Sequence, residues 1–304
     1  MKPALSVIFF TVSSGAGLGL LVWLLIATLM AEHIRMDADT FFKGAAIAAA
    51  FITAGLISST LHLANRKNAI YALSRVTTSW LSREGLLSIL LYPLATLHLF
   101  ALHEGWPQVT PITLCLLVAI AIAILYCTGM IYGCLKTVPR WNTWLTPAKY
   151  VLFGLMSGAV LLPAVLSLRP VEAGPVRRPM VAILLLALGL VLYLAYLLQH
   201  PRRLHTINDA LGFKQGNVRL LDVGHSHGTF LTNEFGFVVA RVRARTLRWF
   251  AILCAFILPI LLCYLTKWFW TASLICLAGL LVERWLFFAE AEHVVRLYHG
   301  QQSV

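Results

Sequence analysis

The feature that most constrains this chain is a succession of apolar segments, each long enough to cross a lipid bilayer as a helix. A hydrocarbon core of about 30 Å requires roughly 20 predominantly apolar residues in helical conformation. Eight segments meet this requirement, and prolines or short polar stretches separate them. Their ranges are 4–31, 44–64, 84–103, 111–133, 147–168, 179–199, 247–266 and 268–289, the last two being divided at Lys267.

The residue composition agrees with a membrane location. Hydrophobic residues make up 60% of the chain and charged residues 12%, whereas about a quarter of the residues in a soluble domain are charged. The first apolar segment is longer than the h-region of a signal peptide, which has about 7–15 residues, so we interpret it as a retained span. The sequence therefore predicts an all-α fold. We expect a polytopic integral membrane protein, a bundle of eight transmembrane helices in a single membrane-anchor domain over residues 1–304.

Several kinds of site are disfavoured by the same pattern. The six cysteines lie within or beside apolar segments and form no CxxC pair, so we expect no disulfide framework, zinc site or iron–sulfur motif in this chain. His225 and His227 lie in the sequence GHSHG without further ligands, which indicates a plain loop and no metal site. The GAGLG stretch at residues 15–19 lies inside a span, where small residues favour close helix packing over nucleotide binding.

The distribution of Lys and Arg predicts the orientation. With eight spans, both termini share one side of the membrane with the second, fourth and sixth loops. The bias toward that side is about three to one, so the positive-inside rule predicts that the termini and the basic loops are cytoplasmic. That side is expected to carry Lys2, Arg66, Lys67, Arg75, Arg83, Lys136, Arg140, Lys149, Arg202, Arg203, Lys214, Arg219, Arg241, Arg243, Arg245 and Arg296. The other side is expected to carry Arg35, Lys43, Arg169, Arg177, Arg178 and Lys267.

The formal charge of +12 admits two compatible interpretations. The basic side can meet anionic lipid, or it can dock a partner. The longest polar segment, residues 200–246, lies on this side and is too short and too rich in glycine to be a catalytic domain. We expect it to order against a partner subunit.

The first candidate site joins the second and third spans. His62 ends the second span and Glu84 opens the third, and the intervening loop can bring them together at one membrane depth. An imidazole can exchange a proton near neutral pH, and a nearby carboxylate can relay that proton to water. Those are the requirements of a quinone headgroup, whose reduction consumes two protons. The alternatives are a helix-end histidine that reaches the interface and a glutamate at a positive helix end.

Two further polar patches accompany this pair. Tyr132, Arg140 and Trp141 cluster where the fourth span leaves the bilayer, which is also typical of an interfacial aromatic belt. Glu283 and Arg284 lie inside the last span, where charges indicate function unless they pair with a neighbouring span. A b-type haem needs two histidines at matching depth. The outer-face histidines His33, His98 and His103 show no evident pairing, so no haem is expected.

The same residues resemble a known family. The stretches KPALSVIFFTVSSGAG, TSWLSREG, CTGMIYGCLKTVPRW, LTPAKY and VERWLFFAEA are similar to signatures of the membrane-anchor subunits of the dimethyl sulfoxide reductase family. The resemblance covers nearly the whole chain and looks closest to the cytoplasm-facing branch of sulfite dehydrogenase anchors. The chain departs from the family pattern in HLANRKNA, which lacks a Gly-Arg-Pro turn after His62, and in Tyr126, where an arginine is usual.

The resemblance implies an eight-helix anchor in the bacterial inner membrane. It would bind an iron–sulfur ferredoxin-like subunit, which connects to a molybdopterin catalytic subunit, and would exchange electrons with ubiquinone or menaquinone. It implies that His62 holds the quinone and that Glu84 relays protons. Arg83 and Arg140 would orient the site or dock the iron–sulfur subunit, while Tyr132 and Trp141 would wall the quinone ring.

The leading functional hypothesis is therefore the quinone-reactive anchor of a sulfite dehydrogenase. The same anchor could serve a complex that reduces dimethyl sulfoxide, tetrathionate or polysulfide with electrons from quinol. A small-anion secondary transporter is a competing class, although the chain has no internal repeat. A purely structural tether would leave His62 and Glu84 without a role.

Overall fold

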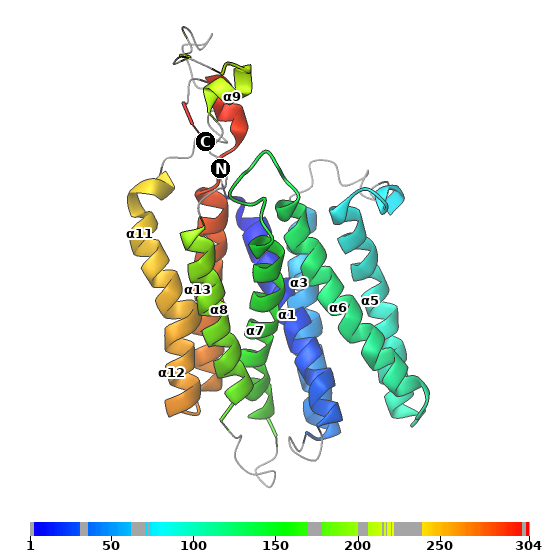
Figure 1. Ribbon diagram of the computed structural model, residues 1–304. Coiled ribbons are helices and arrows are strands. Elements are labelled where there is room, and N and C mark those ends of the chain that lie inside the picture. The colour runs from blue at the N-terminus through cyan, green and yellow to red at the C-terminus, as the bar shows by residue number, and fades with distance from the viewer. Residues whose placement is uncertain are drawn as a thin grey trace.

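The computed structural model describes residues 3–30, 36–61, 71, 73–169, 178–199, 206–214, 216, 218–219, 221, 239–299 and 302–303. Within these residues, eight helices are long and apolar enough to cross a membrane (Figure 1). An isolated bridge between Thr206 and Ser303 is the one β-type pairing in the described part of the chain. The predicted all-α membrane bundle is confirmed.

The spanning helices follow one another along the chain. The bounds are α1 (Leu5–Leu29), α3 (Ala38–Leu61), α5 (Trp80–His103), α6 (Val109–Gly133), α7 (Leu145–Leu166), α8 (Met180–Leu198) and α13 (Phe269–Ala289). The remaining span consists of α11 (Val239–Ile252), a π-helical turn η4 (Leu253–Ile257) and α12 (Leu258–Leu265). Three short elements lie outside the spans: η2 (Leu73–Arg75), α9 (Ile207–Leu211) and η5 (Val294–His299).

Helices α3 and α5 begin several residues earlier than hydropathy alone indicates. Helix α5 starts at Trp80 because the Ser79 side chain caps it, accepting a hydrogen bond from the Ser82 backbone N–H at 3.3 Å. Glu84 therefore lies inside the helix and does not open it. Helix α3 starts at Ala38, and its first turns carry an ion pair of 2.5 Å between the exposed side chains of Lys43 and Asp39.

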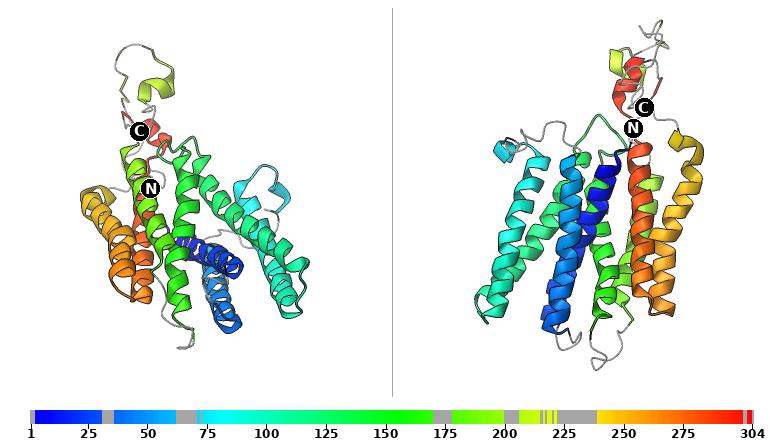
Figure 2. Two further views of the ribbon diagram at one scale, coloured as in Figure 1. Left: turned by 60° about the horizontal axis from the view of Figure 1, so that its bottom comes forward. Right: turned by 180° about the vertical axis from the view of Figure 1, so that it is seen from behind.

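Helices α1 and α7 form the centre of the bundle. Helices α5 and α6 pair on one flank, and α8, α11, α12 and α13 form the other (Figures 1 and 2). The approach of α1 to α7 depends on glycine. A Cβ atom on Gly158 would lie 2.0 Å from the Gly19 carbonyl carbon, and one on Gly19 would lie 1.9 Å from the Gly154 carbonyl oxygen. The predicted use of the small residues at 15–19 in close packing is thus observed at Gly19.

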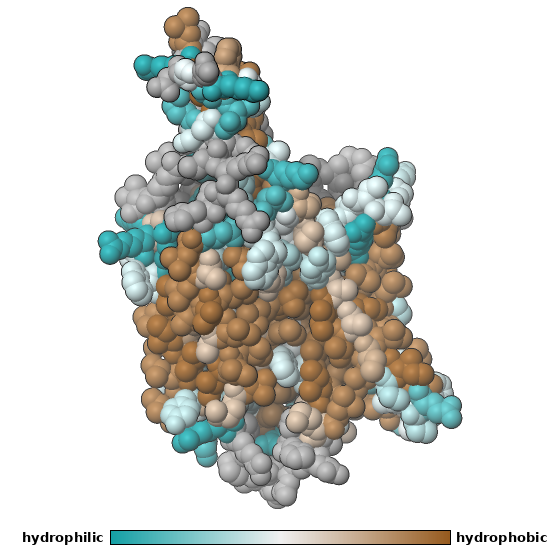
Figure 3. Space-filling view, in the orientation of Figure 1, coloured by the Kyte–Doolittle hydropathy of each residue, from teal (hydrophilic) through white to brown (hydrophobic). Residues whose placement is uncertain are grey.

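The outer surface of the bundle is an apolar belt between two polar ends (Figure 3). Both chain termini lie at one of these ends, which we call the terminal end (Figure 1). The connection between α6 and α7 and the start of α5 lie at the terminal end as well. The links from α5 to α6 and from α12 to α13 lie at the opposite end, which we call the far end.

Part of the long polar segment folds onto the end of the chain. Helix α9 begins with a capping box between Thr206 and Asp209 and ends at Gly212, whose φ of 73° is left-handed. The backbone N–H of Ile207 donates to the Gln302 carbonyl at 3.1 Å, and the Ile207 side chain is buried. Helix α9 therefore stands on the terminal end, beside η5. Docking of the long polar segment to a partner remains a prediction.

Candidate functional site

Glu84 is a buried carboxylate at the terminal end of α5, with 3% of its surface exposed. Its partner is Thr128 on α6, whose hydroxyl contacts Glu84 Oε1 and also lies 2.9 Å from the Ile124 carbonyl oxygen. A hydroxyl has one proton to donate, whereas a carbonyl can only accept. As a carboxylate, Glu84 can accept from Thr128. As an acid, it can donate to Thr128 while Thr128 donates to Ile124. Both protonation states of Glu84 therefore have a partner, as a proton relay requires.

Arg83 stabilises the chain before this carboxylate and lies half-buried. Its guanidinium lies 4.3 Å from the centre of the Trp80 ring and donates to the carbonyl oxygens of Val76 at 2.8 Å and Thr77 at 2.6 Å. Tyr126, which replaces the family's arginine, packs edge-on against Trp80 at 5.7 Å between ring centres. Arg83 thus fixes the entry into α5, while its predicted role in orienting a quinone stays a prediction.

Tyr132 and Trp141 belong to a closely packed aromatic cluster at the terminal end. The Tyr132 ring centre lies 5.3 Å from that of Trp141 and 5.7 Å from that of Tyr150. Trp141 stacks on Phe287 at 5.2 Å, and its indole N–H donates to the Phe287 carbonyl at 3.0 Å. These rings join α6, α7 and α13. The two rings therefore already contact each other in the structure. Their role as the walls of a quinone site stays a prediction.

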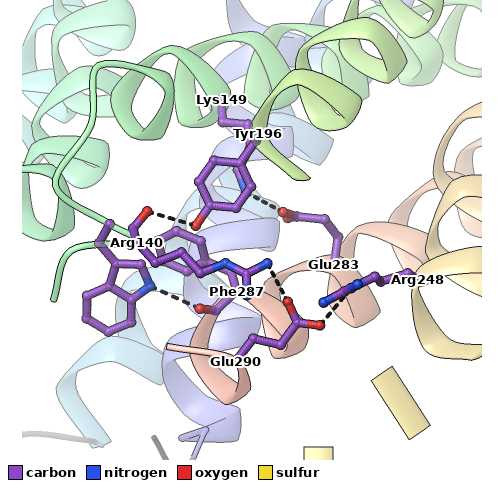
Figure 4. A network of polar contacts seen from close by, with 8 residues as sticks. Arg140, Lys149, Tyr196, Arg248, Glu283, Phe287 and Glu290 are labelled. Carbon is purple, nitrogen blue, oxygen red and sulfur yellow. Dashed lines mark hydrogen bonds and ion pairs between the residues drawn. The ribbon is translucent and has the colours of Figure 1, made fainter. Parts of the chain in front are cut away.

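Arg140 forms an ion-pair network at the rim of the terminal end (Figure 4). Its guanidinium lies 2.6 Å from Glu290 Oε2, and Arg248 contacts Glu290 Oε1 at 2.9 Å. The Arg140 and Arg248 side chains retain 30% and 38% exposure, so this pair of cations can also meet a partner. The Tyr196 hydroxyl donates to the Arg140 backbone carbonyl at 3.3 Å.

A second ionic cluster, Lys149–Glu283–Arg284, is fully buried between α7 and α13. Lys149 Nζ donates to Glu283 Oε1 at 2.6 Å, and Arg284 Nη1 lies 3.3 Å from Glu283 Oε2 (Figure 4 shows the first contact). Lys149 lies at the terminal end, where the sequence places it with the other basic residues, but it is 0% exposed and its side chain points into the bundle. The reason is that α7 begins at Leu145 and turns Lys149 toward the inside of the bundle. The sequence did contain one indication of this burial, because Lys149 lies within the fifth apolar segment.

The remaining predicted site residues are histidines. His62, His33, His225 and His227 lie outside the described residues, so the pairing of His62 with Glu84 stays a prediction. His98 is buried, with Nδ1 2.8 Å from the Thr113 hydroxyl, whereas His103 is exposed in the last turn of α5. In the part of the chain that the structure describes, no three His, Cys, Asp or Glu side chains gather as potential metal ligands.

Comparisons with known proteins point to one family. The sequence model described as DMSO reductase anchor subunit (DmsC) matches residues 1–289. A sulfite dehydrogenase subunit of Allochromatium vinosum is 32% identical to this chain over 333 aligned positions, which cover all of both proteins. No solved structure matches the chain. Glu84, Thr128 and the Lys149–Glu283–Arg284 cluster all lie within the matched range.

Proposed function

From the premise that this chain belongs to the DMSO reductase anchor subunit family and is a membrane anchor of an oxidoreductase, we propose that it passes electrons to a membrane quinone. The complex would contain an iron–sulfur subunit and a molybdopterin subunit. The observation that carries the proposal is Glu84, a buried carboxylate whose two protonation states both have a hydrogen-bond partner in Thr128. Quinone reduction needs such a proton donor beside the headgroup.

The chemical types of the residues present are those that a quinone headgroup needs. Glu84 would supply and recover a proton, and Thr128 would orient the carboxylate. His62, next along the chain after α3, would donate a hydrogen bond to a quinone carbonyl. When bound, the quinone accepts two electrons and two protons. The residues of this chain would hold the quinone and move protons to it.

We propose sulfite as the substrate of the catalytic partner, because the full-length relative is a sulfite dehydrogenase subunit. The terminal end would face the cytoplasm and receive the iron–sulfur subunit. Arg140 and Arg248 support this placement, since they lie at the rim with surface left exposed. Electrons would then pass from sulfite through the partner subunits to quinone without crossing the bilayer.

The test separates quinone reduction from substrate oxidation in the purified complex. We expect Glu84→Gln and His62→Ala to lower quinone-linked sulfite oxidation by about a hundredfold or more, because each removes a proton-transfer group. Activity with an artificial dye that accepts electrons from the iron–sulfur subunit should persist. The matched control is Glu104→Gln, an exposed carboxylate at the other end of α5. Wild-type quinone kinetics in Glu84→Gln would refute the proposed role.

A further inference from the structure

The Lys149–Glu283–Arg284 cluster carries more charge than helix packing requires. Lys149 and Arg284 are cations and Glu283 is the single anion, so the cluster holds a net charge of +1 where 3% or less of each residue is exposed. The Lys149 ammonium lies 3.7 Å from the Tyr196 ring centre, and the Arg284 guanidinium lies 3.7 Å from the Tyr150 ring centre. Aromatic faces stabilise these cations but do not neutralise them. Uncompensated charge at membrane depth indicates function.

Polar atoms around the cluster also lack partners. Among the described residues, Glu283 Oε2, Arg284 Nη1, Tyr150 OH and Tyr193 OH are buried without a hydrogen bond. Glu283 Oε2 and Arg284 Nη1 face each other at 3.3 Å as an ion pair only. Buried polar groups are normally satisfied, often by internal water. Several of them together therefore point to water within the bundle.

A cavity suited to that water adjoins the cluster. Its volume is about 10 Å³, close to what one water molecule needs, and Thr11, Tyr150, Ser157 and Arg284 contribute to its lining. Thr11 and Ser157 donate their hydroxyl protons to backbone carbonyls at 3.0 and 2.8 Å, which leaves their oxygens free to accept from water. Arg284 can donate to the same water.

The cluster is connected to both the rim and the Glu84 site. Toward the rim, the ring of Tyr196 covers Lys149, and its hydroxyl reaches Arg140, which pairs with Glu290 (Figure 4). Toward α6, Tyr150 stacks on Tyr132 at 5.7 Å between ring centres. Tyr132 follows Thr128, the partner of Glu84, by one turn on α6.

We propose that Lys149, Glu283 and the water-sized cavity beside Arg284 form a hydrated proton-transfer site between the Glu290 rim and the α6 side of the bundle, next to Glu84. A proton on Lys149 Nζ moves to Glu283 Oε1 across the bond of 2.6 Å, which converts the ion pair into a neutral amine and a carboxylic acid. Arg284 keeps its charge and orients the water, because a guanidinium does not release its proton.

The direction of transfer rests on the proposed function. Reduction of a quinone to a quinol consumes two electrons from the iron–sulfur partner and two protons from water. Each proton that leaves the Lys149–Glu283 pair toward Glu84 is replaced by one from water at the rim, so the charge of the cluster is unchanged after each transfer.

Hydration is tested in the wild-type complex by radiolytic hydroxyl labelling, which modifies buried residues beside bound water. Tyr150 is 3% exposed, and the control is Phe256, a 0% exposed ring in the apolar core. We expect Tyr150 to be labelled several times faster than Phe256. Equal, slow labelling of the two rings would show that the cavity is dry and would overturn the proposal, whatever the quinone activity.

Proton transfer is tested in membrane vesicles that contain the full complex. We expect Lys149→Met to slow quinone-linked proton uptake about tenfold or more and to enlarge the solvent isotope effect, with dye-linked activity retained. Lys149→Arg should be equally slow, because it keeps the charge but cannot release a proton. The control is Lys43→Met at the far end, where Lys43 pairs with exposed Asp39.

If Lys149→Met kept the wild-type rate of proton uptake and isotope effect, or if Lys149→Arg fully recovered that rate, the cluster would be a structural ion pair with no role in proton transfer. Failure of the wild-type complex to reduce quinone would instead refute the proposed function, and the labelling experiment would still decide hydration.

Discussion

Glu283 lies between two buried cations, with Lys149 Nζ at 2.6 Å and Arg284 Nη1 at 3.3 Å. Loss of its charge would leave both cations without a counter-ion, and the cost of a buried unpaired ion exceeds the benefit of a buried pair. Loss of Lys149 would leave a neutral Glu283–Arg284 pair. The three residues are therefore unequal in their effect on stability.

We predict that Glu283→Gln lowers the free energy of unfolding by about 3–5 kcal/mol, as expected for an uncompensated buried charge. Lys149→Met should cost clearly less, since the remaining charges cancel. Thermal inactivation of the purified complex in detergent would measure both variants. Equal losses, or a larger loss in Lys149→Met, would contradict this account of the cluster.

At the scale of the elements, α1 and α7 approach through glycine and leave no room for a side chain. The Cβ of an alanine at position 158 would meet the backbone of Gly19 and Leu20, at 2.0 and 2.2 Å. Backbone atoms cannot move aside as a flexible side chain can. Gly85 on α5 offers the opposite case, because a Cβ there would meet nothing within 4 Å.

We predict that Gly158→Ala destabilises the bundle by at least about 1–3 kcal/mol, the usual cost of overpacking. Gly85→Ala should be neutral or stabilising by up to about 1 kcal/mol, because alanine favours the helix. The yield and thermal stability of the two variants in detergent would compare them. A Gly158→Ala variant as stable as the wild type would exclude the close contact of α1 with α7.

Apolar length was sufficient to predict the eight helices, because each span must satisfy its backbone hydrogen bonds internally. The observed start of α5 differs from the predicted start for a local chemical reason. Ser79 caps the helix, which places Glu84 one turn inside it. The partner of Lys149 could not be predicted, because Glu283 lies 134 positions further along the chain and only packing brings them together. The role of Glu84 as a site residue remains a prediction that its burial supports.

At the scale of the whole molecule, the two polar ends of the bundle decide where the redox partner can bind. The terminal end carries Arg140, Arg248 and Lys136, and the far end carries Lys267 between α12 and α13. The positive-inside rule predicts a cytoplasmic terminal end. Lys149 lies at the same end with its side chain buried, so the count of basic residues on each side is unchanged.

We predict that a membrane-impermeant maleimide labels Lys267→Cys in intact cells but reaches Lys136→Cys only after the membrane is opened. The exposed native thiols Cys115 and Cys134 are first replaced by serine. Mass change of the purified protein would report the labelling. The reverse pattern would place the terminal end in the periplasm.

The central claim is that quinone binds beside Glu84, between the first turns of α5 and the last turns of α6. The most direct measurement is photo-crosslinking of the purified complex with an azido-quinone, followed by peptide mapping. The account predicts crosslinks within residues 80–91 or 124–132 that excess natural quinone suppresses and that Glu84→Gln weakens. Suppressible crosslinks confined to α8 and α12, with the Glu84 region unlabelled, would contradict it.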